Sequence, residues 1–325
     1  MFDVIARPAA AALLALFLVL PAAAQDLPVI RAAVLKIGTV NWELSTIAEN
    51  GFDTGHGFRL EVVPYADNGA TRVAVEGGEA DMAVADWIWV ARQRAAGKDY
   101  VFVPYSRAVG GLVAPADSGA KSLKDLAGGK IGIAGGPLDK SWLILRAYAQ
   151  QEYGMDLQAE TEQVFGAPPL IFKTALGGDL DGAINFWHFL AKMKAAGMTE
   201  VISVEDAGMA LGLDTDTPLL GYYLKESFLD AHPGLAQALY AASRDAKDLL
   251  ATDPAAWDAI RPQMNAGSDA QFDQLKADWL AGTPNRGPVD IDGATRMLEL
   301  MNTLGGADLV GEATSVPAGL FADVE

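Results

Sequence analysis

Residues able to bind a small molecule follow the ends of several predicted strands. In α/β sheets, ligands bind beyond the carboxyl ends of the strands, where loops and helix N-termini converge. The candidates in the first half of the chain are Asn41, Trp42, Glu43, Asp86, Trp87 and Arg107. Those in the second half are Gly135, Gly136, Asp139, Ser141, Asn185, Trp187 and His188. We expect these residues to line a binding cleft.

Aromatic residues recur at these positions. Four of the seven tryptophans, Trp42, Trp87, Trp142 and Trp187, lie at or near the predicted strand ends. Any one of them is most simply a core residue. The four together favour an aromatic cleft wall that stacks on a solute.

The charged candidates each have two interpretations. Arg107 could bind a carboxylate or oxyanion through two hydrogen bonds, or it could form an ion pair between lobes. Glu43, Asp86 and Asp139 would favour a cation, an amine, a polyol or a metal complex if all three face the cleft. As helix N-caps they would say nothing about ligand charge.

The segment Gly135–Ser141 combines two features of a binding loop. Gly135 and Gly136 permit close approach of the backbone, and Ser141 with the free amides of the following helix could hold an anionic or carbonyl group. The same residues are also compatible with ordinary loop chemistry.

Catalytic patterns are missing from the sequence. His56, His188 and His232 show no H-E-x-x-H spacing, and there is no Gly-x-Ser-x-Gly elbow, Walker A loop or Rossmann fingerprint. The absence of cysteine excludes disulfides, thiolate metal sites, Cys nucleophiles and a lipoprotein anchor. Of the three histidines, only His188 is expected near the cleft. It would either contact the ligand or be a hydrogen-bonded structural residue. We therefore expect no catalysis and no cofactor, and we assign no metal ligands.

The elements that must position these residues alternate between short β-rich runs and longer amphipathic runs. The first series of predicted strands is Val34–Val40, Phe58–Val63, Met82–Ala85 and Tyr100–Tyr105. The second series is Lys130–Ala134, Glu162–Phe165, Leu180–Ile184 and Glu200–Ser203. This alternation is typical of βαβ units with a parallel sheet. We predict two similar α/β lobes.

An internal echo supports the two lobes. Gly78–Val84 parallels Gly178–Ile184, each with a Gly turn and an Asp before a short buried strand. The chain should cross between the lobes in the Gly- and Pro-containing segment Ala108–Lys121 and return in Leu211–Tyr223. From Glu226 onward the pattern is mostly helical.

The N-terminus has the pattern of a secretory signal peptide. Arg7 precedes the uncharged apolar run Ala9–Leu20, which ends in Pro21 and three alanines. That run is shorter than the roughly 20 residues that cross a bilayer. We assign residues 1–24 to a signal peptide cleaved near Ala24/Gln25, 25–110 to lobe 1, 111–215 to lobe 2, and 216–325 to a return to lobe 1 and C-terminal helices.

The formal net charge of the chain is −18. The signal segment contributes nothing to it, because Asp3 and Arg7 cancel. The acidic surface of the mature chain would repel nucleic acid and anionic lipid, both of which require basic patches. We expect neither as a partner.

Four segments follow one another along the chain, namely Gly57–Pro64, Glu76–Asp81, Lys121–Ile133 and Tyr222–Pro233. In these segments the sequence resembles the NitT/TauT family of ABC solute-binding proteins. Members of that family bind nitrate, sulfonates, thiamine-precursor pyrimidines and related small molecules. The order and spacing of the segments carry the resemblance, since no one segment is diagnostic.

The resemblance implies an α/β, type II periplasmic-binding fold, in which two lobes close over a ligand about a two-segment hinge. It also implies a periplasmic monomer that delivers its solute to an ABC permease and ATPase. Where nitrate- and sulfonate-binding relatives tend to offer small hydroxyl residues, this chain has Asn41–Glu43, Asp86–Trp87 and Gly135–Ser141. The identity of the ligand is therefore not inherited.

Two alternatives remain open. One is a receptor for a metal or metal complex in the same importer class. A hard cation needs six or more oxygen ligands, and without a D-x-D-x-D-G loop these would have to converge from separate loops. The other is an enzyme on the same fold, resembling pyrimidine-precursor synthases, in which a cleft histidine is used chemically.

Overall fold

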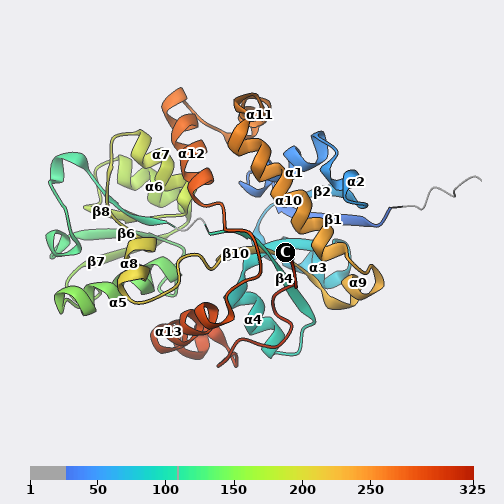
Figure 1. The fold of residues 1–325 in the computed structure, drawn as a ribbon. Coiled ribbons are helices and arrows are strands. Elements are labelled where there is room, and N and C mark those ends of the chain that lie inside the picture. The colour runs from blue at the N-terminus through green and yellow to red at the C-terminus, as the bar shows by residue number, and fades with distance from the viewer. Residues whose placement is uncertain (1–26, 108–109) are drawn as a thin grey trace, which may run out of the picture.

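The computed structural model describes residues 27–107 and 110–325, and it consists of two α/β lobes (Figure 1). Each lobe is built on a five-stranded sheet. The strands of lobe 1, in sheet order, are β2 (Arg59–Tyr65), β1 (Val29–Leu35), β3 (Met82–Asp86), β10 (Leu220–Lys225) and β4 (Tyr100–Ser106). Those of lobe 2 are β7 (Glu162–Gly166), β6 (Lys130–Ala134), β8 (Gly182–Ile184), β5 (Gly111–Ala114) and β9 (Thr199–Ser203). The predicted two-lobed α/β fold is confirmed.

Both sheets are mixed, whereas the sequence predicted parallel ones. In lobe 1, β1 is parallel to β2 and β3, and β10 is antiparallel to β3 and β4. In lobe 2, β6 is parallel to β7 and β8, and β5 is antiparallel to β8 and β9. The antiparallel strand of each sheet is the one that enters directly from the other lobe, so no βαβ crossover fixes its direction.

The first strand lies earlier than predicted. β1 spans Val29–Leu35 and pairs in register from Val29 with Arg59 to Leu35 with Tyr65. Helix α1 (Val40–Glu49) then begins within the predicted strand. Val40, Leu44 and Ile47 recur at helical spacing and are buried, so tertiary burial of one helix face prevails over the β propensity of valine.

The internal echo of the sequence has one structural role in both lobes. Asp81 Oδ2 accepts from the Arg31 amide at 2.9 Å, and Asp181 Oδ2 accepts from the Lys130 amide at 2.7 Å. Asp81 lies at the end of the turn before β3 and bonds to β1, and Asp181 lies at the end of the turn before β8 and bonds to β6. The preceding Gly78 and Gly178 have φ of 79° and 83°, in the left-handed region that glycine tolerates.

Helices cover the faces of both sheets (Figure 1). Those of lobe 1 are α1, α2 (Phe52–Gly55), α3 (Asn68–Gly77), α4 (Trp87–Ala95), α9 (Glu226–Ala231) and α10 (Leu235–Thr252). Those of lobe 2 are α5 (Lys140–Tyr153), α6 (Pro168–Leu176), α7 (Trp187–Ala195) and α8 (Val204–Ala210), with 3-10 turns at Ala116–Ser118 and Leu123–Leu126. Within residues 27–107 and 110–325, no helix combines the length and apolar character needed to cross a bilayer.

The C-terminal helices join the two lobes. They are α11 (Pro254–Ile260), a 3-10 turn at Arg261–Met264, α12 (Asp269–Ala281) and α13 (Ile291–Val310). Helix α12 packs against α7 of lobe 2, and α13 packs against both α4 and α5. Lys194 of α7 pairs with Asp278 of α12 at 2.8 Å. The sequence did not indicate this link between the lobes.

The first crossing between the lobes falls between β4 and β5, and its residues 108–109 lie outside the described part of the chain. The segment predicted as this crossing, Ala108–Lys121, also contains strand β5. Gly110 passes so close to lobe 2 that a Cβ there would lie 2.5 Å from the Asn185 carbonyl oxygen. The return crossing runs from α8 to β10 through residues 211–219.

A buried polar network ties α1 to the rest of lobe 1. Glu43 has no exposed surface and forms an ion pair with Lys247 of α10. Its Oε1 accepts from Tyr222 Oη at 2.8 Å and from Ser243 Oγ at 2.5 Å. The Lys247 ammonium also lies 4.8 Å from the centre of the Tyr105 ring. Burial lowers the pKa of Lys247, and the Glu43 carboxylate opposes that shift.

We expect Lys247→Met to lower the free energy of unfolding by about 3–5 kcal/mol, because it leaves the Glu43 carboxylate buried without its cation. The double variant Glu43→Gln/Lys247→Met should recover much of this loss, since the Gln oxygen can still accept from Tyr222 and Ser243. Urea unfolding of the variants and the wild type measures both effects. A Lys247→Met protein within about 1 kcal/mol of wild type would contradict the argument.

Candidate functional site

A cleft of about 640 Å³ lies between the two lobes. Lobe 1 contributes the loop after β1 around Gly38 and Thr39, the start of α3, and Asp86 at the end of β3. Lobe 2 contributes Gly135–Ser141 after β6 and Ile184–His188 after β8. The cleft therefore lies at the carboxyl ends of parallel strands from both sheets. Ligands of α/β proteins bind at these ends, which we call the strand-end rule.

Four helices begin at the cleft, namely α1, α3, α5 and α7. Asp67 and Asp139 cap α3 and α5 by accepting from the amides of Ala70 and Trp142. Thr39 and Phe186, at the N-caps of α1 and α7, supply no such side-chain hydrogen bond. A helix N-terminus carries partial positive charge, so these two ends without a side-chain cap favour an anion.

An ion pair crosses the cleft. Lys140 Nζ, in the first turn of α5, lies 3.2 Å from Oδ2 of Asp86 in lobe 1. The other oxygen of Asp86 caps α4 by accepting from the Trp89 amide at 2.8 Å. Asp139 caps α5, and burial raises its pKa while the hydrogen bond from Trp142 opposes that shift. The two carboxylates thus have partners within the protein, in agreement with the N-cap interpretation.

Arg72 is a cation of the cleft wall that the sequence reasoning missed. Its guanidinium lies 4.2 Å from the centre of the Trp89 ring. In the described part of the chain, no carboxylate forms an ion pair with Arg72. Arg72 follows β2, and the strand-end rule applied to β2 would have pointed to the segment that contains it. Lys140 and Phe186 are further lining residues outside the predicted set.

All seven of the predicted residues of lobe 2 line the cleft. Together with Asp86 of lobe 1 they are Gly135, Gly136, Asp139, Ser141, Asn185, Trp187 and His188. Asn185 is buried, donates to the Pro168 carbonyl at 2.9 Å and accepts from the Phe186 amide at 2.8 Å. It therefore fixes the loop that presents Trp187 and His188.

Asn41, Trp42 and Glu43 do not line the cleft, because the first strand ends earlier than predicted. They form the first turn of α1 instead of a strand-end loop. Asn41 donates to the Leu35 carbonyl at 2.9 Å, and Glu43 belongs to the buried network. Trp42 is buried and meets Trp187 edge to face, with ring centres 5.7 Å apart, in a cluster completed by α11 and α12.

Trp87, Trp142 and Arg107 do not line the cleft either. Trp87 begins α4, is fully buried and contacts Phe321, while Trp142 is buried in the same core. Arg107 forms ion pairs with Glu205 of lobe 2 at 3.4 Å and with Asp216 of the return crossing at 3.1 Å. This geometry agrees with the interpretation of Arg107 as part of an ion pair between the lobes. Of the four tryptophans, only Trp187 reaches the cleft wall.

His188 is half-buried in the cleft wall among aromatic rings, the nearest being Phe189 at 4.6 Å between centres. Burial lowers the pKa of its imidazole to about 4, and Lys192 adds a smaller repulsion. The ring is therefore neutral at pH 7 and can both donate and accept a hydrogen bond. Among the residues that the structure describes, no three His, Cys, Asp or Glu side chains converge to hold a metal ion.

The chain matches the model of the NMT1/THI5-like family over residues 45–256, well over half its length, and it belongs to that family. Comparison with curated protein sequences gives no match. The resemblance seen in the sequence is thus confirmed at the level of family.

Solved structures show the same fold. A protein from Bordetella bronchiseptica RB50 superposes with a TM-score of 0.68 at 22% identity, covering 92% of this chain and 95% of that one. The periplasmic aliphatic sulphonate-binding protein SsuA of Escherichia coli gives 0.69 at 15% identity, covering 91% and 94%. The alkanesulfonate-binding SsuA of Xanthomonas axonopodis pv. citri, bound to MOPS, gives 0.67 at 15% identity, covering 92% and 100%.

Replacing Trp87 tests whether it is a core residue. We expect Trp87→Ala to lower the free energy of unfolding by about 3–5 kcal/mol, because the buried indole leaves a cavity. Phe186→Ala is the matched control, since Phe186 is an aromatic residue at the start of α7, shortly after β8, but is 43% exposed. Its change should stay within about 1 kcal/mol. Urea unfolding that gives similar small losses for both variants would show that Trp87 is not packed as described.

We expect His188 to stay neutral down to about pH 4. Histidine ring NMR signals followed from pH 8 to 3.5 measure this, and His188→Gln identifies the resonance. The unfolded chain binds the proton at a higher pH than the folded chain does. Folding stability should therefore fall between roughly pH 6.5 and 4, and less so in His188→Gln. A midpoint near 6.5 for His188 would show that the ring is solvated.

Proposed function

We propose that this protein is the periplasmic solute-binding receptor of an ABC importer. The observation that carries the proposal is the cleft of about 640 Å³ whose walls come from both lobes. That volume lies within the range of small-molecule sites. The sulfonate-binding proteins that share the fold support the same role. Its partners would be the permease and ATPase of the importer, to which it would deliver the solute as a monomer.

The ligand that the cleft fits best is a small organic anion. Arg72 offers a guanidinium that pairs with no carboxylate of residues 27–107 and 110–325, and the N-termini of α1 and α7, which lack a side-chain cap, add partial positive charge. Asp86 and Asp139 are occupied as helix caps. These features favour an anion over the cation or metal complex that the carboxylates alone would suggest. Sulfonates, which the two SsuA proteins are named for binding, are the first class to test.

Binding would close the lobes over the ligand. We expect the hinge in the two connections between the lobes, the one between β4 and β5 and the one through residues 211–219, because the chain passes between the lobes there. The packing of α12 against α7 adds a third connection that any opening must accommodate. Trp187, held edge to face against Trp42, lies where the lobes meet.

Chemical turnover is the competing function, and His188 is the observation that would favour it. A neutral imidazole in a partly buried cleft could accept a proton. Incubation with a bound solute followed by mass analysis of the small molecule decides between the two. An unchanged solute supports the receptor, whereas a product that is lost in His188→Gln supports an enzyme.

Replacing Arg72 tests the charge of the ligand. Native mass spectrometry of the purified protein identifies any retained solute, and calorimetry with ethanesulfonate gives an affinity. Arg72→Gln should weaken anion binding at least tenfold, as expected for loss of a charge-assisted hydrogen bond worth about 1.5–3 kcal/mol. Arg146→Gln is the control, because Arg146 also lies over a tryptophan, Trp142, but away from the cleft. Equal affinities in Arg72→Gln and Arg146→Gln would overturn the anion assignment.

A further inference from the structure

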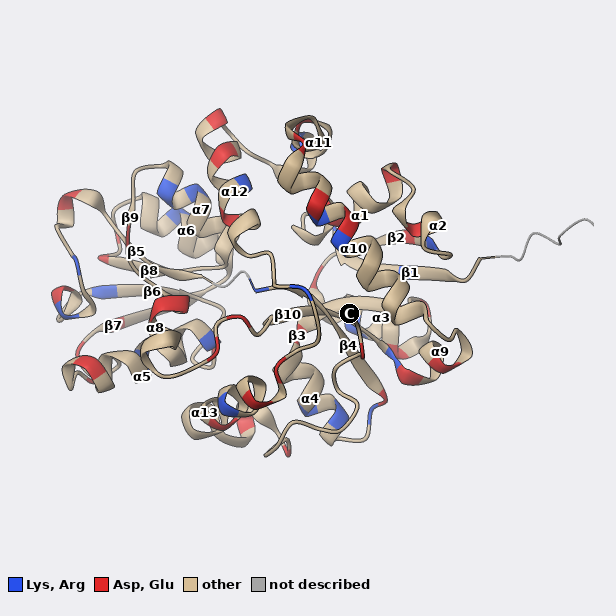
Figure 2. Cartoon of the chain, viewed as in Figure 1, with Lys and Arg blue, Asp and Glu red and all other residues tan. Residues whose placement is uncertain are grey.

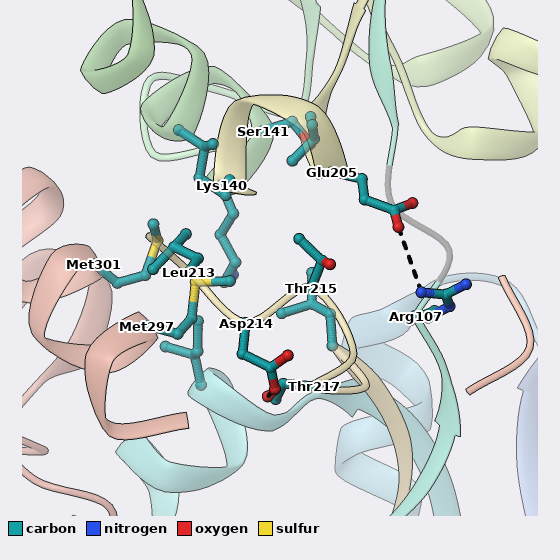
Figure 3. Close-up of a pocket in the computed structure, with 15 residues that line it drawn as sticks. Arg107, Lys140, Ser141, Glu205, Leu213, Asp214, Thr215, Thr217, Met297 and Met301 are labelled. Atoms are coloured by element: carbon teal, nitrogen blue, oxygen red, sulfur yellow. Dashed lines mark hydrogen bonds and ion pairs between the residues drawn. The ribbon is translucent and has the colours of Figure 1, made fainter. Parts of the chain in front are cut away.

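A second, smaller cavity of about 50 Å³ lies beside the cleft. Its walls come from α5, α8, the return crossing and α13 (Figure 3). Most of its walls are apolar side chains, namely Ile88, Ile144, Leu213, Leu219, Met297 and Met301. We call it the side chamber. Its volume has room for about three or four water-sized groups.

Several polar groups at the edge of the side chamber already have partners. Asp214 accepts from the Asp216 amide at 3.0 Å and from Thr217 Oγ1 at 2.7 Å. Glu205 is paired with Arg107, as Figure 3 shows. A guest would therefore meet mainly methylene, methyl and thioether groups, which suit an uncharged apolar group. The two methionines are unbranched and flexible, so this wall can adjust to its guest.

The side chamber borders the cleft. Lys140, Ser141 and Leu219 line both cavities. The Lys140 side chain extends along the side chamber, and its ion pair with Asp86 lies at the boundary. Asp86 would keep its hydrogen bond from the Trp89 amide if Lys140 moved away. An anionic head group in the cleft could thus attract Lys140 and open the boundary at modest cost.

We propose that the side chamber is a subsite for the short apolar end of the organic anion whose head group occupies the cleft. This inference rests on the proposed function. The head group pairs with Lys140 and Arg72, and the apolar end passes Leu219 to lie between Ile144 and the two methionines. The receptor would then select anions by the length of an aliphatic chain of about three or four carbon atoms.

A chain-length series tests the subsite. Calorimetry with linear 1-alkanesulfonates from methane- to hexanesulfonate should show the affinity of the wild type rising about fourfold per buried methylene, and then levelling off or falling once the side chamber is full. An affinity independent of chain length would overturn the proposal.

Gly208 allows the side chamber to be filled selectively. It lies on α8 in the chamber wall, and a Cβ there would be 3.7 Å from its nearest neighbour, the side chain of Leu213. Gly208→Leu should abolish the gain with chain length while leaving the affinity for methanesulfonate within about twofold. Gly208→Ala should shorten the preferred chain by about one carbon, and it keeps the test valid if the leucine variant does not fold. Met209→Leu is the matched control, since Met209 is the next residue of α8 and is 52% exposed.

The same chain-length dependence in Gly208→Leu and Met209→Leu would overturn the proposal, because the apolar end would then lie in the cleft alone. If no alkanesulfonate binds the wild type, that choice of ligand class fails, and xenon bound in pressurised crystals tests the side chamber separately. Xenon density beside Met297 that disappears in Gly208→Ala would support the apolar subsite. Absence of xenon there in the wild type would overturn it.

Discussion

The buried ion pair between Glu43 and Lys247 determines how lobe 1 presents its side of the cleft. It joins the first turn of α1 to α10, and through Tyr222 it reaches the antiparallel strand at the inner part of the sheet. Tyr105 lies between this network and the cleft, where its ring is part of the wall. A buried charge tolerates few alternative positions for its partner. The pair therefore fixes the N-terminus of α1 at the site.

Contacts of two physical kinds hold the lobes together. The ion pairs of Lys140 with Asp86 and of Arg107 with Glu205 remain partly exposed, so water can replace much of what they contribute. The aromatic contact between Trp42 and Trp187 is buried, and separating those rings would expose apolar surface. Opening of the cleft is thus opposed mainly by the apolar cluster that α11 and α12 complete. The ion pairs therefore contribute more to the relative orientation of the two lobes than to the free energy that holds the lobes together.

The sequence was informative where local rules decide the structure. Lys130–Ala134 was predicted as a strand with its correct bounds, because buried β-rich residues are followed by a glycine turn. The rule that ligands lie at strand ends found most of the lobe 2 wall. It failed at Asn41–Glu43, since the preference of valine for strands hid the start of a helix. Trp87 was misplaced because sequence alone does not reveal which side of a helix start faces the core. The packing of α12 on α7 depends on residues that are far apart in the sequence, so no local pattern indicated it.

The whole chain is strongly acidic, whereas the charged side chains that line its cleft balance, with Arg72 and Lys140 against Asp86 and Asp139. The formal net charge is −18, and Figure 2 shows acidic residues on helices of both lobes. To this balanced set of side chains the cleft adds the partial positive charge at the N-termini of four helices. At physiological salt the field of an exposed charge is screened within about 8 Å, so the outer carboxylates scarcely reach a ligand enclosed between the lobes. Groups inside the cleft act at contact distance and in a less polar surrounding, where they are worth more. A strongly acidic protein can therefore hold an anion, because the ligand is recognised by the few groups that surround it.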